Sequence, residues 1–403
     1  MSSSTRQHKK ISEIANIKSG KRLPKWFFVQ DEKTNYPYIR VSDFWNDGTI
    51  DSSNIKYISK NIFEQISKYI ITSQDLYISI AGTIGKTWII PSSLNWANLT
   101  ENAVRLVYKD KDNINNKYIL YFTKTSSFAK QAWLATRAVA MPKLAITRLK
   151  EIQIPLPPLA TQKAIVAKLD EAMESIDKSI ALTEENITKC DEMWQTSLKN
   201  NLDNLEWDAK YIIDVAEKIQ YWYTGKTQDS GTYRYLRITD IQNNKVNRNT
   251  VPFVEITDKE AQKYRLNKGD VIFARTWATV WKSFLIWDEW EWEVFASYLI
   301  RIIPNYNLLV PEYIKYFFRS DLYRDQIFAD VVWAAQPNFN WKKLWNISFK
   351  VPSITEQRKA VDDLNAIHAQ YLDIRSKYKK KIKYFEKLKS STLHAAFTGK
   401  LVS

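Results

Sequence analysis

The chain repeats much of its own sequence about 195 residues apart. The heptapeptide YIRVSDF at residues 38–44 returns as YLRITDI at residues 235–241, and IGKT at residues 84–87 returns as VWKS at residues 280–283. Five further residues recur with unchanged spacing: Pro142, Leu149, Ile152, Pro157 and Gln162 return as Pro337, Leu344, Ile347, Pro352 and Gln357. A repeat of this length indicates a duplicated domain and not a short-period solenoid. We therefore expect two copies of one fold that perform the same kind of task on two similar targets.

Each copy begins with a globular part. From residue 11 to about residue 157, short runs of β-branched and aromatic residues alternate with polar turns such as Asn46-Asp47-Gly48, a pattern typical of an α+β domain. The segment PLPPL at residues 155–159 ends this part. Proline lacks the amide hydrogen that helices and central strands need, so this segment is expected to be an extended exit from the domain.

A long helix follows each globular part. Apolar residues recur every three or four positions between Ile165 and Leu198, and again between Ala360 and Leu388. This spacing predicts an amphipathic helix of about 40 residues, roughly 60 Å long, in each copy. One helix cannot bury so long an apolar seam alone, so we expect the two helices to pair antiparallel as a coiled coil. Thr161 and Thr355 are the predicted amino-terminal caps.

The predicted fold class is therefore α+β, with two globular domains separated by two long antiparallel coiled-coil helices in a pseudo-twofold internal repeat. The expected boundaries are residues 1–158 for the first domain, 159–205 for the first spacer helix, 206–353 for the second domain, and 354–403 for the second spacer helix and tail.

Composition points to a polyanionic partner. The chain has 403 residues, of which 45% are hydrophobic and 14% aromatic, so it is long and apolar enough for two folded cores. The formal charge is +15 at pH 7, which favours nucleic acid as the partner. The sequence shows no apolar run of membrane-spanning length, and its start lacks the apolar core of a signal peptide, so we expect a cytoplasmic protein without a membrane anchor.

Neither a metal site nor a catalytic site is predicted. One cysteine, Cys190, and three scattered histidines do not form a zinc motif. Residues 82–87, GTIGKT, resemble a phosphate-binding P-loop, but Ile80 stands where the motif needs glycine and Trp281 replaces Gly85 in the second copy. The repeated acidic residues, Asp43 with Asp240 and Asp75 with Asp270, are interpreted as turn caps. We therefore expect no cofactor.

The candidate nucleic-acid contacts are polar and basic residues at matching places in the two copies, on the glycine-containing turn and just before the exit segment. Such side chains suit contacts with phosphates and base edges, although each one alone also fits an ordinary solvated face. In the first copy they are Lys86, Thr87, Arg137, Lys143 and Arg148, and in the second Arg275, Lys282, Ser283, Asn338, Asn340 and Lys343.

The exits PLPPLATQ at residues 155–162 and VPSITEQ at residues 351–357, each leading into a long helix, make the chain resemble the specificity (S) subunit of type I restriction-modification systems. The segment LHAAFTGKL at residues 393–401 is similar to the ending of that family. The resemblance covers essentially the whole chain.

The resemblance implies that residues 11–157 and 211–352 are target recognition domains, each reading one half of a split sequence in double-stranded DNA. It also implies that the helices set the gap between the half-sites and dock two methyltransferase (M) subunits, with restriction (R) subunits in the full complex. Gln162 and Gln357, repeated at the start of the helices, are the predicted partner contacts. The subunit itself is expected to be non-catalytic.

Two other interpretations stay open at this point. One is the specificity subunit of a related methyltransferase-nuclease assembly. The other is a coiled-coil scaffold that carries two binding modules and does not bind DNA, an alternative that the basic charge and the exit segments disfavour.

The tryptophan content is unusual. The chain has 16 tryptophans but only 8 glycines, and several tryptophans stand where a turn is expected, among them Trp277, Trp281 and Trp290. A bulky residue in a conformation suited only to glycine costs about 1–3 kcal/mol. Two explanations remain open: the host reads some UGA codons as glycine, or these tryptophans are exposed partner-binding residues.

Overall fold

A computed structural model of the protein describes residues 7–44, 50, 53–134, 144–203, 206–221, 223–242, 245–274, 283–287, 293–329 and 344–401. The chain divides into two compact units, Met1–Thr183 with Lys380–Ser403, and Glu184–Lys379. Both divisions fall inside long helices, α6 (Leu159–Leu202) and α12 (Ile354–Thr398), so each unit contains a part of each helix.

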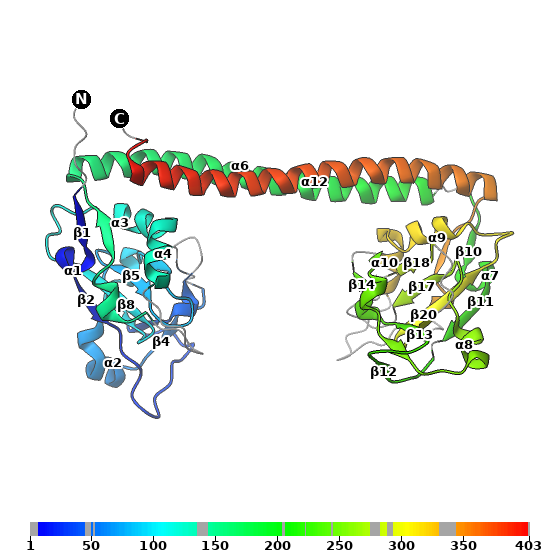
Figure 1. The fold of residues 1–403 in the computed structure, drawn as a ribbon, viewed down its shortest axis with the longest axis horizontal. Helices are drawn as coiled ribbons and strands as arrows, with labels where there is room; N and C mark the ends of the chain where they lie inside the picture. The colour runs from blue at the N-terminus through cyan, green and yellow to red at the C-terminus, as the bar shows by residue number, and fades with distance from the viewer. Residues whose placement is uncertain are drawn as a thin grey trace. The chain divides into compact units, whose positions relative to one another are not determined.

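The first unit is built on a four-stranded antiparallel sheet with the strand order β2-β8-β5-β6 (Figure 1). A smaller sheet has the order β4-β3-β7, and a third pairs β1 with β9. The strands are β1 (His8–Lys10), β2 (Ala15–Ser19), β3 (Pro37–Ile39), β4 (Lys56–Tyr57), β5 (Leu76–Ser79), β6 (Thr87–Trp88), β7 (Asn98–Leu99), β8 (Ala103–Tyr108) and β9 (Gln153–Pro155). The helices are α1 (Ile11–Ile14), α2 (Lys60–Ile66), α3 (Asn116–Thr123), α4 (Ser126–Leu134) and α5 (Ile146–Leu149), with 3₁₀ turns η1 (Val41–Asp43), η2 (Ser67–Tyr69) and η3 (Ser92–Leu94).

The second unit repeats this plan with a four-stranded sheet of order β11-β20-β17-β18, a sheet of order β12-β16-β13-β19, and the pairs β10-β21 and β14-β15. The strands are β10 (Ala209–Tyr211), β11 (Ala216–Tyr221), β12 (Thr227–Gln228), β13 (Tyr233–Leu236), β14 (Ile241–Gln242), β15 (Lys245–Val246), β16 (Phe253–Val254), β17 (Val271–Ala274), β18 (Ser283–Leu285), β19 (Glu293–Phe295), β20 (Leu299–Pro304) and β21 (Ser348–Lys350). The helices are α7 (Ile212–Val215), α8 (Asp258–Tyr264), α9 (Pro311–Phe317) and α10 (Asp321–Ala329), with η4 (Ile238–Asp240) and η5 (Arg248–Thr250).

The main sheet of each unit is buried on both faces. Successive side chains of a strand point to opposite faces, so Leu76 and Ile78 of β5 enter the core beneath the helices, whereas Tyr77 enters the core on the other face. In the second unit, Val271 and Phe273 of β17 face the helices and Ile272 faces away. This two-sided burial explains why these strands are continuously apolar.

The long helices complete the core of each unit. In the first unit, Leu393 and Ala396 of α12 join Ile165 and Leu169 of α6 in the main core. In the second unit, residues near the carboxyl end of α6 and the amino end of α12 do the same: Trp194, Leu198, Leu202, Ala360, Val361 and Leu364. The predicted domain boundaries assigned whole helices to separate segments, whereas the packing divides each helix between the units.

The helix pair is antiparallel within each unit. In the first unit, the ammonium of Lys168 donates to the carbonyl of Leu401 at 3.0 Å, and Asp177, farther along α6, pairs with Lys389. In the second unit, Asp191 pairs with Arg375 at 3.0 Å, and Trp194 stacks on Tyr371. As the residue number rises along α6, the number of the contacting residue on α12 falls. The predicted α+β class, with two domains and two long antiparallel helices, is confirmed.

The amino-terminal cap of α12 lies two residues before the predicted one. Ser353 and Glu356 form a capping box, in which the Ser353 hydroxyl and amide both donate to the Glu356 carboxylate, at 2.6 and 3.0 Å, and the Glu356 amide donates to the Ser353 hydroxyl at 3.4 Å. The helix begins at Ile354, so Thr355 is already in its first turn. Thr161 likewise lies inside α6. Among the described residues, no helix combines the length and apolar character that crossing a membrane requires.

Candidate nucleic-acid interface

The turn between β5 and β6 carries the first predicted DNA contact. Gly82 and Gly85 have φ of 75° and 80°, values that other residues rarely adopt. The amides of Gly85 and Lys86 donate to the carbonyl and the hydroxyl of Ser79, at 2.9 and 3.1 Å, and so close the turn. Lys86 is exposed at its end. The turn is therefore closed by hydrogen bonds, with an exposed lysine at its end.

The neighbouring threonine faces the opposite way. Thr87 is 6% exposed, and its hydroxyl lies 2.5 Å from that of Thr123 on α3. Its counterpart Ser283 on β18 is fully buried, and its hydroxyl has no hydrogen-bond partner in the described structure. Strand alternation explains both positions, because the residue after an outward-pointing lysine points inward. The placement does not support the prediction that Thr87 and Ser283 contact DNA.

Of the other predicted contacts, Arg148 lies on the short helix α5 and is partly exposed. The rest fall outside the described residues: Arg137, Lys143, Arg275, Lys282, Asn338, Asn340 and Lys343. Trp277, Trp281 and Trp290 lie outside them as well.

Gln162 and Gln357 are fully buried at the junctions between the exits and the helices. The side-chain nitrogen of Gln162 donates to the backbone carbonyls of Pro157 and Asn113. Its side-chain oxygen accepts from the backbone amide of Asn115 at 2.9 Å. Gln357 makes the same three bonds, to Pro352, Leu308 and Val310. Each glutamine ties its helix to its globular domain, a structural role in place of the predicted contact with a partner protein.

Other side-chain bonds repeat in the same way, and the sequence did not single them out. Tyr118 and Tyr313 donate to the exit carbonyls of Pro155 and Lys350. Gln131 and Gln326 each make a pair of bonds with an exit-strand backbone, at Gln153 and Ser348 respectively. The 195-residue spacing of these polar residues was a signal that could have identified them.

The repeated acidic residues make buried ion pairs and caps. Asp43 and Asp240 accept from the amides of Arg40 and Arg237 and pair with their guanidiniums. Asp75 pairs with Arg105 at 3.3 Å, and Asp270 pairs with Arg301 at 2.6 Å. Burial raises the pKa of Asp270 even though the charge of Arg301 acts to lower it. The predicted capping role is confirmed for Asp43, Asp240 and Asp270, the last of which accepts from the Asn267 amide.

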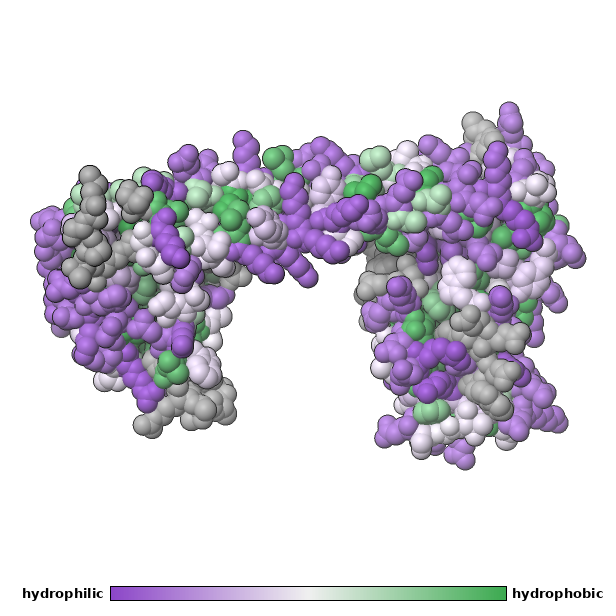
Figure 2. All heavy atoms as spheres, turned by 45° about the horizontal axis from the view of Figure 1, so that its top comes forward, coloured by the Kyte–Doolittle hydropathy of each residue, from purple (hydrophilic) through white to green (hydrophobic). Residues whose placement is uncertain are grey.

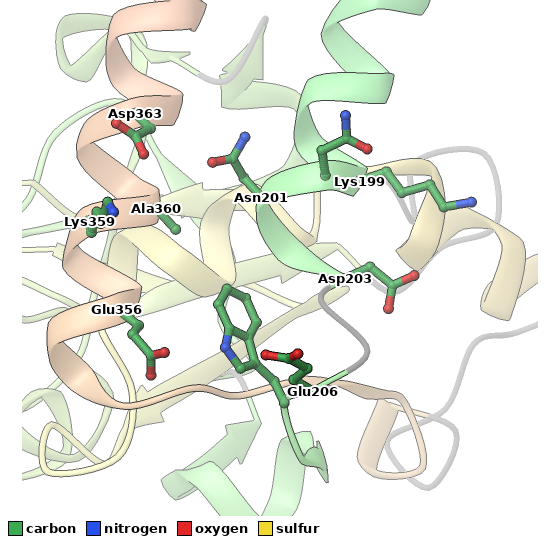
Figure 3. Close-up of a pocket in the computed structure, with 10 residues that line it drawn as sticks. Lys199, Asn201, Asp203, Glu206, Glu356, Lys359, Ala360 and Asp363 are labelled. Atoms are coloured by element: carbon green, nitrogen blue, oxygen red, sulfur yellow. The ribbon is translucent and has the colours of Figure 1, made fainter.

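A pocket of about 720 Å³ lies in the second unit where α6 ends and α12 begins. Figure 3 shows Asp203, Glu206 and Glu356 around it. Asp363, Lys199 and Lys359 also line it, which gives four carboxylates against two ammonium groups. An excess of negative charge repels DNA phosphates, so this end of the helix pair is unsuited to bind nucleic acid.

The helices carry exposed apolar side chains. They are Leu182 and Met193 on α6, which are 52% and 69% exposed, and Leu372, Ile374 and Tyr384 on α12, which are 50%, 42% and 63% exposed. Figure 2 shows hydrophobic residues interspersed with hydrophilic ones along the visible face of the helices. Met193 and Tyr384 belong to residue types that are enriched in protein–protein interfaces.

Comparison with known proteins identifies the family. The sequence model of the type I restriction modification DNA specificity domain matches twice, over residues 4–189 and 204–384. The chain therefore belongs to the type I restriction-modification specificity family, and the resemblance predicted from its exit segments and repeat is confirmed.

Two relatives match nearly the whole chain. The EcoKI specificity subunit of Escherichia coli (strain K12) is 22% identical over 98% of this chain and 88% of that protein. The MjaVIII specificity subunit of Methanocaldococcus jannaschii is 23% identical over 97% of this chain and 92% of that protein.

Two solved structures share the fold. A chain from a type I restriction-modification system, solved to address complex assembly and conformational transition, has a TM-score of 0.78 at 16% identity and covers 98% of both chains. The HsdS subunit of Thermoanaerobacter tengcongensis has a TM-score of 0.56 at 16% identity, over 98% of this chain and 97% of that one.

Proposed function

We propose that this protein is the DNA-reading subunit of a type I restriction-modification complex, and that each of its domains recognises one half of a bipartite sequence in double-stranded DNA. The observation that carries this proposal is the double match to the specificity-domain family on two copies of one scaffold. Because the copies share buried polar bonds but differ in surface sequence, they are suited to read two different half-sites.

The electrostatics support DNA as the target. A formal charge of +15 attracts a polyanion, and the release of counterions from the duplex makes such binding strongly dependent on salt. In the first domain, the exposed Lys86 lies at the end of a turn closed by hydrogen bonds, a geometry that suits a contact with a backbone phosphate.

The helices support a second role, the docking of two methyltransferase subunits, with restriction subunits in the full complex. The exposed apolar residues of α6 and α12 supply contact area for these partners. The subunit itself performs no chemistry in this proposal, since its repeated acidic residues are engaged in caps and ion pairs with arginine.

Reconstitution tests the proposal. The chain is co-expressed with the methyltransferase subunit of a type I system from the same host, and methylated sites are mapped by methylome sequencing. We expect one bipartite motif from the complex, and neither methylation nor cleavage from the chain alone with S-adenosylmethionine, ATP and magnesium. Turnover by the chain alone, or a continuous motif, would contradict it.

A further inference from the structure

A second pocket in the second unit carries an excess of buried positive charge. It has a volume of about 910 Å³ and lies among α9, α10, the hairpin β14-β15 and the adjoining parts of α6 and α12. Lys315 and Arg319 line it from α9 and the residues after it, and His368 lines it from α12.

Within the described part of the chain, two of these cations lack the partners that buried charges normally require. Lys315 is 3% exposed, and no carboxylate of the described structure forms an ion pair with it. Its ammonium lies 4.3 Å from the ring centre of Tyr316 and 4.4 Å from that of Trp287. The Nε of Arg319 is buried and has no hydrogen-bond partner among the described residues. Such burial is costly unless an anion compensates for it.

Among the described residues, the groups that line the pocket do not supply that anion. Arg324 and Arg375 line the pocket, and they pair with Asp321 and Asp191, so those two carboxylates are already neutralised. Lys245 of β15 adds a further positive charge. Burial, followed by the charge of Arg319, lowers the pKa of Lys315 to about 8, although the charge of Glu312 acts to raise it. Burial and the two cations also lower the pKa of His368.

The first copy shows that the scaffold does not need Lys315 or His368, although it keeps a cation, Lys124, at the position of Arg319. At the positions 195 residues earlier, Leu120 stands for Lys315 and Met173 for His368. The surrounding framework is the same, because Tyr121 bonds to Asp170 on α6 as Tyr316 bonds to Asn365 on α12. The second copy therefore carries a lysine and a histidine that the first lacks, and it has a neutral amide where the first has a carboxylate. All three differences favour an anion.

We propose that the pocket formed by Lys315, Arg319 and His368 binds a phosphate group. An ammonium, a guanidinium and an imidazole together offer several charge-assisted donors, the set that suits a phosphate with its several acceptor oxygens. The pocket is much larger than one phosphate and includes the rings of Tyr316 and Tyr371, which leaves room for the rest of a nucleotide or for part of a DNA strand. If the ligand is a free phosphate compound, the site is independent of the proposed DNA recognition. If the ligand is a phosphate of a DNA strand, the site is part of that recognition and rests on the proposed function.

Histidine NMR of the full chain tests this site directly. The protein contains three histidines, of which His8 and His394 belong to the first unit and serve as internal references. The ring signals are titrated with pH, without ligand and then with inorganic phosphate, ADP or a short DNA duplex. We expect a bound phosphate to raise the pKa of His368 by about one unit while His8 and His394 stay unchanged. A shift with phosphate or ADP identifies a free ligand, and a shift with duplex alone identifies a strand phosphate.

Two variants decide whether the pocket is responsible. Lys315→Leu, which copies the first domain, and Arg319→Gln should each reduce the phosphate-induced shift at least tenfold at a fixed ligand concentration. Lys315→Leu is expected to keep or raise the melting temperature, which separates lost binding from lost folding. Lys218→Ala, on an exposed strand of the same unit, is the matched control for the loss of one charge. No shift with any ligand, or an equal shift in Lys315→Leu, overturns the proposal. Neither outcome depends on methylation, so this experiment is independent of the one that tests the proposed function.

Discussion

Two tryptophans occupy backbone conformations that favour glycine. Trp96 has φ of 75° at the third position of the turn at residues 94–97, which is closed by the Ala97 amide and the Leu94 carbonyl at 3.2 Å. Asn95 before it has φ of −54° and ψ of 141°, so the turn is of type II, whose third position calls for glycine. Trp26 has φ of 74° at the same position of a turn closed between Phe27 and Pro24.

Neither of these two side chains packs into a core, which is the role of the buried tryptophans. Trp26 is 89% exposed and Trp96 is 66% exposed, whereas Trp88 and Trp194 are buried in the cores. The contrast favours the first of the two explanations of the tryptophan content, in which the host reads some UGA codons as glycine.

We predict that the codons for Trp26 and Trp96 are UGA, and that those for Trp88 and Trp194 are UGG. Peptide mass spectrometry of protein from its native host should find glycine at the first pair and tryptophan at the second. In recombinant protein, Trp26→Gly and Trp96→Gly should each raise the free energy of unfolding by about 1 kcal/mol, because they relieve a left-handed conformation. UGG codons at residues 26 and 96 would refute the recoding.

The buried pair of Arg301 and Asp270 gives a second prediction at this scale. The two side chains are 4% and 1% exposed, so Arg301→Met leaves a carboxylate buried without its cation. We expect this change to lower the free energy of unfolding by about 3–5 kcal/mol at pH 7.

The loss should depend on pH in a defined direction. The pKa of folded Asp270 is already raised by burial, and removing Arg301 removes the main influence that lowers it. A raised carboxyl pKa means that the folded state takes up a proton before the unfolded state does, so the folded variant recovers stability as the pH falls through that pKa. Urea unfolding at pH 7 and pH 5 should show a smaller difference from the wild type at pH 5. A difference that grows toward pH 5 would contradict this account.

At the scale of elements, the sequence predicted the long helices well. Spacer helices were expected over residues 159–205 and 354–403, and α6 and α12 span Leu159–Leu202 and Ile354–Thr398. A seam that repeats over many turns is a strong signal, because every turn must be buried on the same side. The cap of α12 was misplaced although the sequence carries its signature, because residues 353–356, SITE, match the capping-box pattern and serine caps a helix at least as well as threonine.

The sequence was less informative about the domains. The short strands were recognised as a class, but their pairing was not, since register depends on contacts between segments distant in the chain. Thr87 and Ser283 were expected at the surface because they lie on the repeated glycine-containing turn, yet one strand position turns a side chain from solvent to core. The burial of Gln162 and Gln357 likewise indicates a structural role, anchoring each helix to its domain, that their repetition in the sequence did not reveal.

We predict that Gln162→Leu and Gln357→Leu each lower the free energy of unfolding. Leucine has a similar size but leaves the buried amides of Asn115 and Val310 without their acceptors, at a cost of about 1–3 kcal/mol. The residues lie in different units, so their effects should add in the double variant. Gln65→Leu, on the exposed face of α2, is the control. Chemical denaturation measures all four variants against the wild type, and wild-type stability in the two buried single variants would contradict the anchoring role.

At the scale of the whole molecule, each unit combines segments from both halves of the sequence. The first unit takes residues 380–403 from the end of the chain, and the second takes residues 184–202 from the end of the first helix. Duplication therefore produced two domains that each complete their core with a helix from the other copy. Phe397, whose ring lies 5.0 Å from that of Tyr118 and 5.4 Å from that of Phe122, is an example in the first unit.

This arrangement sets the conditions for a domain exchange. Replacing residues 11–157 with the matching segment of a relative should change one half of the methylated motif and leave the other half and the gap intact, because the second unit and both helices are retained. The exchange should fold well only when the donor accepts the side chains of Leu393, Ala396 and Phe397 in its core.

Two chimaeras separate these effects. One carries the donor domain on the original helices, and the other also carries the donor's residues at positions 393–397. A mismatched core costs about 1–3 kcal/mol, and such a loss lowers the melting temperature of a domain of this size by a few degrees per kcal/mol. If the first chimaera therefore melts several degrees below the wild type, the second should recover the wild-type melting temperature. Both should methylate the same new half-site. If methylome sequencing showed that a single exchange changes both halves of the motif, the domains would not read DNA independently, and the two-reader proposal would fail even though the fold is duplicated.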